Sequence, residues 1–326
     1  MTEHYTRPDV AAFLGFLNGL PGPKMHELDP AAARTGMLAM RAVADVEVGE
    51  IAVRRDLSVP GPAGPIKARL FDPRERRAPG PIMMFFHGGG FVLGDCDTHE
   101  PLCAEIARVL DLPVVSVDYR LAPENPWPAA PDDCEAATRW VAGSPSELGV
   151  VPTSLIVCGD SAGGNLAIVT AMALRDAPAA VPVIVQAPIY PAVDGRDDWP
   201  SFAAFGDGRL LTHEAMKYFF DAYQAEAGHL RAHPLDHDQA GMPATCLITA
   251  GLDPLRDQGR AYAAKLIDAG VPVVFREAQG NIHGFAQLRK GIPSSSGDLA
   301  GFLAGLKPMI AESEADRVMA QAAQAA

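Results

Sequence analysis

Ser161 lies in the pentapeptide Gly159-Asp160-Ser161-Ala162-Gly163, between an apolar run and a run with helical spacing. The preceding residues, TSLIVC, are short, apolar and rich in β-branched side chains, which is typical of a buried strand. The following residues, NLAIVTAMALRD, repeat apolar side chains at helical spacing. A serine between glycines at such a turn is typical of a nucleophile elbow, where a strained backbone exposes the hydroxyl. The pentapeptide alone is a weak signal, because small residues are common in turns.

Two further residues complete the set that a serine nucleophile needs. Asp253 follows the apolar run ATCLITAG, and His283 follows VPVVFREA by one loop. Reactive groups in a parallel sheet gather at the carboxyl ends of the strands. A serine hydroxyl needs an imidazole to take its proton, and a carboxylate fixes the tautomer of that imidazole. We therefore predict Ser161 as nucleophile, His283 as base and Asp253 as the acid that orients it.

A glycine-rich loop supplies the fourth part of this chemistry. The stretch FFHGGGFVLG follows the apolar run PIMMFF and places Gly88, Gly89 and Gly90 in succession. Their bare backbone N–H groups, together with that of Ala162, can donate to the oxyanion of a tetrahedral intermediate. A flexible turn is the alternative, and it carries little weight beside the ordered serine, acid and histidine.

The other histidines have plainer interpretations. We expect His87 to hold the glycine loop through hydrogen bonds, and His99 to be a surface or helix-capping residue. His229, His233 and His237 are spaced four apart, as metal ligands can be, but a proline at position 234 interrupts any helix there. We therefore predict no metal site and no organic cofactor.

The elements that must position these residues alternate between strand and helix after about residue 50. Strands are expected at 51–59 and 66–71 as an antiparallel start, then at 81–86, 113–119, 153–158, 182–190, 244–251 and 271–278. Helices are expected at 101–110, 131–142, 165–176, 255–269 and 299–310, followed by a frayed tail. Apolar strands alternating with helices indicate an α/β fold, with a mostly parallel sheet covered on both faces.

Two segments break this alternation. Residues 1–48 contain helical stretches, and residues 192–233 form an insertion with a helix between two core strands. An insertion of that size usually carries function. We expect both segments to form a helical cap over a catalytic domain of residues 49–326. The predicted substrate-binding residues are Phe91, Tyr190, Phe219 and Phe220, and for the last two ordinary core packing is the alternative.

Composition limits the classes of partner. The chain has 326 residues, 48% of them hydrophobic, and a formal net charge of −13 with no block of Lys or Arg, which disfavours nucleic acid. We see no signal peptide and no apolar run long enough for a membrane span. Five scattered cysteines without a C-x-x-C pair favour reduced, buried thiols. We expect a cytoplasmic protein that acts on a small molecule; a homodimer stays open.

Six segments in this order carry a family resemblance: HGGGF (87–91), DYRLAPE (118–124), PAAPDD (128–133), GDSAGGN (159–165), DPLRD (253–257) and HGF (283–285). With them the chain resembles the hormone-sensitive-lipase-like carboxylesterases, also called bacterial family IV. The resemblance implies an α/β-hydrolase fold with a helical cap, and hydrolysis of carboxylic esters through a covalent acyl-enzyme. The insertion and the apolar N-terminal stretch would close the pocket to a limited volume, so we expect short- to medium-chain acyl esters as substrates. An amide or N-acyl hydrolase or a deacetylase with the same triad is an alternative, and a non-catalytic receptor for a small ligand is a second one.

Overall fold

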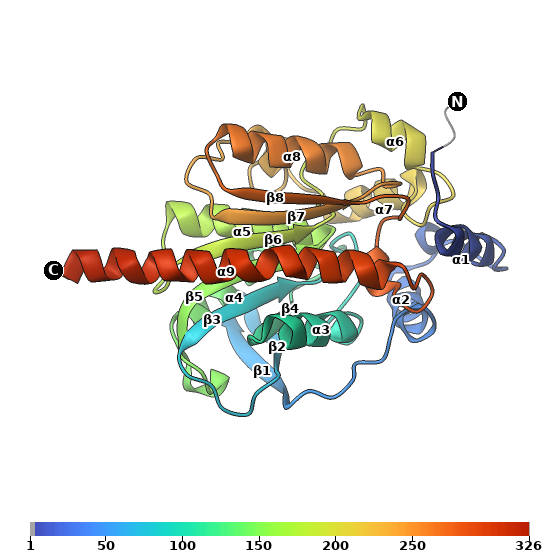
Figure 1. The fold of residues 1–326 in the computed structure, drawn as a ribbon. Coiled ribbons are helices and arrows are strands. Elements are labelled where there is room, and N and C mark those ends of the chain that lie inside the picture. Colours follow the sequence, from blue (N-terminus) through green and yellow to red (C-terminus); the bar gives the residue numbers. More distant parts are fainter. Residues whose placement is uncertain (1–3, 326) are drawn as a thin grey trace.

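The computed structural model describes residues 4–325 and has one eight-stranded sheet at its centre (Figure 1). The strands are β1 (Val53–Gly61), β2 (Gly64–Asp72), β3 (Gly80–Phe86), β4 (Val114–Asp118), β5 (Pro152–Asp160), β6 (Val183–Ile189), β7 (Ala244–Ala250) and β8 (Val273–Ala278). Their order in the sheet is β1-β2-β4-β3-β5-β6-β7-β8. β1 and β2 pair antiparallel, β2 and β4 do too, and every other pairing is parallel. The expected strands and their antiparallel start are confirmed.

Helices cover both faces of the sheet. α3 (Glu100–Leu110) and α9 (Ser295–Ala325) pack on one face, and α4 (Ala129–Ala142), α5 (Ala162–Asp176) and α8 (Arg256–Asp268) pack on the other. β3 shows why its sequence is apolar throughout. Met84 and Phe86 join the core under α4 and α5, while Met83 and Phe85 join the core under α3 and α9. Successive side chains of a strand point to opposite faces, so a strand buried on both needs apolar residues at every position.

The N-terminal segment and the insertion lie together at the end of the sheet toward which the parallel strands point (Figure 1). The first contains α1 (Pro8–Asn18), a turn of 3-10 helix (Met25–Glu27) and α2 (Pro30–Ala44); the second contains α6 (Pro200–Phe205) and α7 (His213–Tyr223). Met25 and Phe219 belong to the same apolar cluster, and the Asn18 side chain donates to the Gly208 carbonyl at 3.0 Å. Thr212 caps α7 by accepting the N–H of Ala215 at 3.2 Å.

Two helices differ from the sequence-based expectation. α5 begins at Ala162, directly after the serine, instead of at Asn165. α9 has 31 residues and includes positions 320–325 of the tail that we expected to be frayed. Alanine and glutamine favour helix, and Glu314 fixes the helix by accepting the hydroxyls of Thr153 and Ser154, each at 2.7 Å. This anchor on β5 comes from residues about 160 positions away, which local sequence does not reveal.

Candidate active site

Ser161 occupies a sharp turn between β5 and α5. Its φ of +56° and ψ of −117° lie outside the ordinary regions for a residue with a side chain. The backbone is held there because the Ser161 N–H donates to the Ile189 carbonyl at 2.9 Å and its own carbonyl accepts the N–H of Asn165 at 3.1 Å. A Cβ atom on Gly163 would collide with the carbonyl oxygen of Phe86. The glycine therefore lets the start of α5 pack against the end of β3.

Ser161, His283 and Asp253 form a continuous hydrogen-bonded chain. The Oγ of Ser161 lies 2.8 Å from the Nε2 of His283, and the Nδ1 of His283 lies 2.6 Å from the Oδ2 of Asp253. Asp253 is fully buried and His283 nearly so. With its Nδ1–H donated to the carboxylate, the imidazole presents a lone pair on Nε2 to the serine hydroxyl. The structure thus brings together the three residues predicted as nucleophile, base and acid.

Further contacts hold Asp253 and His283 in place. The second carboxylate oxygen of Asp253 accepts the N–H of Leu255 at 2.8 Å, as α8 begins. The ring of Tyr190 packs against that of His283 with centroids 4.8 Å apart. The Leu252 N–H donates to the Asn281 carbonyl at 2.9 Å, which ties the turn that carries the acid to the loop that carries the base.

The three loop glycines do not play equal parts. The N–H of Gly88 donates to the Oδ1 of Asp160 at 2.8 Å, so it is already engaged. Among the described residues, no protein acceptor takes the N–H groups of Gly89, Gly90 or Ala162. Gly89 and Gly90 have φ values of +120° and +61°, a region that favours glycine. Two loop amides and the first amide of α5 therefore stay available to an anion beside Ser161.

Asp160 anchors the glycine loop from below. Its Oδ2 accepts an N–H of Gln287 at 2.9 Å, and its Oδ1 lies 3.2 Å from the Nε2 of His99. Burial by itself would raise the pKa of Asp160, but His99 and the Gly88 N–H outweigh it and hold that pKa below its usual range. The prediction that His99 lies at the surface or caps a helix through its side chain is wrong, because the residue is fully buried under this loop. Neither its position nor that of Gln287 has a signature in local sequence.

His87 supports the same loop from inside the core. Its Nδ1–H donates to the Gly88 carbonyl at 2.9 Å, and its ring stacks on that of Tyr119 at 4.2 Å. Burial, reinforced by His99, lowers the pKa of His87 to about 4. The ring is therefore neutral near pH 7 and holds the loop, as the sequence-based interpretation expected.

The four residues assigned to the substrate pocket have different surroundings. The ring of Phe219 lies directly on Gly90, where an added Cβ would enter it. Phe91 is mostly buried and stacks on Tyr223 with centroids 3.8 Å apart. Tyr190 is fully buried behind His283, so it supports the base instead of facing a ligand. Phe220 is 47% exposed, on a different side of α7 from Phe219.

The three evenly spaced histidines are engaged with the protein. His233 Nδ1 accepts the Gly228 N–H at 2.9 Å, and His237 Nε2 bonds to the Gly228 carbonyl at 2.9 Å. The ring of His229 packs edge-on against Trp127. Among residues 4–325, no group of three or more His, Cys, Asp or Glu side chains is arranged to hold a metal ion.

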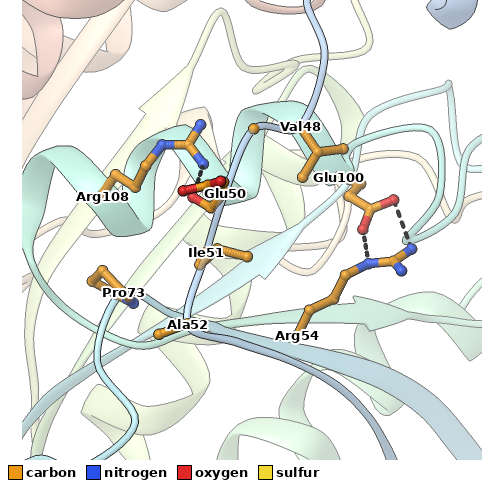
Figure 2. A pocket seen from close by; sticks show the side chains of 9 residues that line it. Val48, Glu50, Ile51, Ala52, Arg54, Pro73, Glu100 and Arg108 are labelled. Atoms are coloured by element: carbon orange, nitrogen blue, oxygen red, sulfur yellow. Dashed lines mark hydrogen bonds and ion pairs between the residues drawn. The ribbon is translucent and has the colours of Figure 1, made fainter.

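A cavity of about 940 Å³ lies beside α3 at the β1 edge of the sheet (Figure 2), and Ser161 is not among the residues that line it. Three of the charged residues that line it, Arg54, Glu100 and Arg108, have partners. Arg54 pairs with Glu100, and Arg108 donates to the Glu50 carbonyl at 3.2 Å. These contacts engage both arginines of the lining, and we assign the cavity no function.

Comparisons with known proteins agree with this geometry. A family described as alpha/beta hydrolase fold matches residues 83–287, more than half of the chain. The chain is 40% identical over 248 residues to the esterase LipI of Mycobacterium tuberculosis, covering 74% of this chain and 77% of that protein. It is 34% identical over 292 residues to the ethyl acetate hydrolase of Pseudomonas putida, covering 86% and 92%.

A solved structure shows the same fold over nearly the whole chain. The thermostable esterase from Pseudomonas putida ECU1011 superposes with a TM-score of 0.89 at 32% identity, covering 95% of this chain and 99% of that one. In the described part of the chain, no helix is both long and apolar enough to cross a membrane. The chain belongs to the alpha/beta hydrolase fold family, in the branch of esterases similar to hormone-sensitive lipase.

Proposed function

We propose that the chain is a serine carboxylesterase in which Ser161 forms a covalent acyl-enzyme. The observation that carries the proposal is the hydrogen-bonded chain from Ser161 through His283 to Asp253, with contacts of 2.8 and 2.6 Å. In the first step the Oγ of Ser161 attacks the ester carbonyl carbon, and the Nε2 of His283 takes the hydroxyl proton. The Asp253 carboxylate stabilises the imidazolium that forms.

The carbonyl oxygen becomes an oxyanion in this step. The N–H groups of Gly89, Gly90 and Ala162 are its proposed donors, since the Gly88 N–H is held by Asp160. When the tetrahedral intermediate collapses, His283 returns the proton to the leaving alcohol and the acyl group stays on Ser161. Water then attacks the acyl carbon, with His283 as base, and releases the acid. No step in this sequence needs a metal ion or an organic cofactor.

We further propose that the substrates are small esters with short to medium acyl chains. Phe219 of α7 covers Gly90, and Met25 of the N-terminal segment packs in the same cluster as Phe219. This contact supports the proposal that both segments form a cap over the site. Each methylene group of an acyl chain that is buried in the pocket contributes about 0.8 kcal/mol to binding. A cap closes the pocket and so limits the number of methylene groups that can be buried. The similarity to an ethyl acetate hydrolase supports the short end of this range.

A cytoplasmic location is part of the same proposal. All five cysteines are free and buried. Burial raises the pKa of the Cys158 thiol and of the four others, which keeps them protonated and unreactive. Free thiols of this kind suit a reducing compartment.

A panel of p-nitrophenyl esters from acetate to palmitate tests the proposal. We expect hydrolysis of the shorter esters by the wild-type protein and none above background by Ser161→Ala. Ser116→Ala is the matched control, because Ser116 is a buried serine of β4 whose hydroxyl has no partner among residues 4–325. Its activity should equal that of the wild type. Faster hydrolysis of the corresponding p-nitroanilides than of the esters would favour an amide hydrolase instead.

A further inference from the structure

Arg7 joins the start of the chain to the loop that carries His283. Its backbone N–H donates to the Gly280 carbonyl at 3.2 Å, and its Nε donates to the Gln279 carbonyl at 2.7 Å. Its two terminal nitrogens donate hydrogen bonds to the two carboxylate oxygens of Asp298, at the start of α9, at 2.6 and 2.9 Å. The side chains of Arg7 and Asp298 are only 17% and 15% exposed. A two-point bond between such groups is stronger and more specific than a single contact.

Asp298 passes this connection on to the catalytic loop. Its Oδ2 also accepts an N–H of the Asn281 side chain at 2.8 Å. Asn281 is fully buried, and its own Oδ1 accepts the N–H of Ile282 at 3.0 Å, next to His283. The Asn281 carbonyl accepts the Leu252 N–H at 2.9 Å, next to Asp253. The Asp298 carboxylate therefore binds Arg7 and also binds Asn281, in the loop that carries His283.

The N-terminal residues also pack on this loop. We call residues 4–9 the N-terminal strap; Figure 1 shows the chain passing the carboxyl end of β8 there. A Cβ atom on Gly280 would approach the ring of Tyr5 to 2.8 Å and the side chain of Arg7 to 3.1 Å. At the other end of the strap, Asp9 Oδ2 accepts the N–H of Ser294 at 2.9 Å. The strap thus touches the loop through backbone, side-chain and ring contacts.

We propose that Arg7 is a positioning residue for the base His283, an inference that rests on the proposed esterase function. The loop has glycine at positions 280 and 284, with φ values of +72° and +79°, so its own backbone restricts it weakly. Arg7 restricts the conformation of the loop through four hydrogen bonds, two to the loop and two to Asp298. A small displacement of the imidazole lengthens the contact between His283 and Ser161, and loss of such alignment slows the chemical step without weakening substrate binding.

Arg7→Ala in the full-length protein tests the proposal with two measurements. Hydrogen–deuterium exchange followed by mass spectrometry should show faster exchange in the peptide spanning 279–284. Active-site-titrated kinetics with p-nitrophenyl acetate should show kcat lowered by about tenfold or more, with little change in KM. Arg7→Lys keeps one donor to Asp298, so its exchange rate and its kcat should lie between those of the wild type and those of Arg7→Ala. Guanidinium ions in the millimolar range should restore part of the kcat of Arg7→Ala, whereas sodium chloride at equal ionic strength should not.

Arg77→Ala is the matched control. Arg77 and Asp72 form a similarly covered pair, 14% and 7% exposed, at the end of β2 and away from the catalytic loop. Its loss should lower stability while leaving exchange in 279–284 and kcat unchanged. Wild-type exchange and kcat in Arg7→Ala would overturn the inference and leave the esterase proposal standing. A wild-type protein that hydrolyses no ester would overturn the esterase proposal, and the exchange measurement would still decide whether Arg7 orders the loop.

Discussion

Gly163→Ala tests whether residue 163 must be glycine because α5 packs closely on the end of β3. In an unobstructed helix this change stabilises, by about 1 kcal/mol. At Gly163 the new Cβ would overlap the carbonyl oxygen of Phe86 and come within 2.6 Å of that of His87. Both obstacles are backbone atoms at the end of β3, which cannot rotate away as a side chain could. Relief requires α5 and the glycine loop to move apart.

The structure sets the size of the expected effect. Overpacking of this kind costs about 1–3 kcal/mol, so the usual gain from alanine should be cancelled or reversed. The movement also separates the N–H of Ala162 from those of Gly89 and Gly90, the proposed oxyanion donors. Removal of one such donor lowers kcat by about 10²–10³. Because the displacement weakens such a donor, we expect kcat to fall by about a hundredfold, with KM nearly unchanged.

Gly36→Ala is the control for this experiment. Gly36 lies in α2, exposed, with nothing within 4 Å of an added Cβ. The substitution should raise the free energy of unfolding by about 0.5–1 kcal/mol and leave kcat unchanged. Urea unfolding followed by circular dichroism and titrated kinetics with p-nitrophenyl acetate measure both variants. If Gly163→Ala gains as much stability as Gly36→Ala and keeps wild-type kcat, the packing argument is refuted.

Three other outcomes are expected. Asp253→Asn should lower kcat per mole of folded protein by about 10⁴ and Ser161→Ala by about 10⁶, and equal losses would contradict the separate roles given to acid and nucleophile. Burial lowers the pKa of His87 to about 4, so the unfolded chain binds its proton first as the pH falls. The free energy of unfolding therefore falls as the pH is lowered from about 6.5 to about 4. Urea unfolding at a series of pH values should show that this free energy depends less steeply on pH in His87→Asn than in the wild type. Phe219→Ala should move the optimum of kcat/KM toward longer acyl chains in a p-nitrophenyl ester series, and an unchanged profile would remove Phe219 from the acyl site.

The hydrogen-bonded chain of Ser161, His283 and Asp253 could be predicted because each member follows a strand that sequence reveals. Ser161, Asp253 and His283 stand after three apolar runs, and the carboxyl ends of parallel strands meet at one edge of a sheet. The alternation of strand and helix likewise indicated the α/β architecture. These inferences need only local pattern and chain order.

The supporting contacts could not be predicted in this way. Gln287 reaches Asp160 across 127 positions, and Arg7 reaches Asp298 across 291. Such pairs depend on how distant elements dock, and neither residue has a distinctive neighbour in sequence. Adjacent residues of a helix point about 100° apart, so only one of Phe219 and Phe220 could face Gly90. Which one does so is set by the rotation of α7, which its sequence alone left open.

The central claim is that Ser161 carries the acyl group during turnover. Acid quenching during steady-state hydrolysis of p-nitrophenyl acetate, followed by peptide mass spectrometry, tests it most directly. We predict a peptide containing Ser161 that is heavier by one acetyl group, absent from Ser161→Ala and more abundant in a variant whose deacylation is slowed. Hydrolysis at full rate by Ser161→Ala, or an acetyl group found only on another residue, would contradict the account.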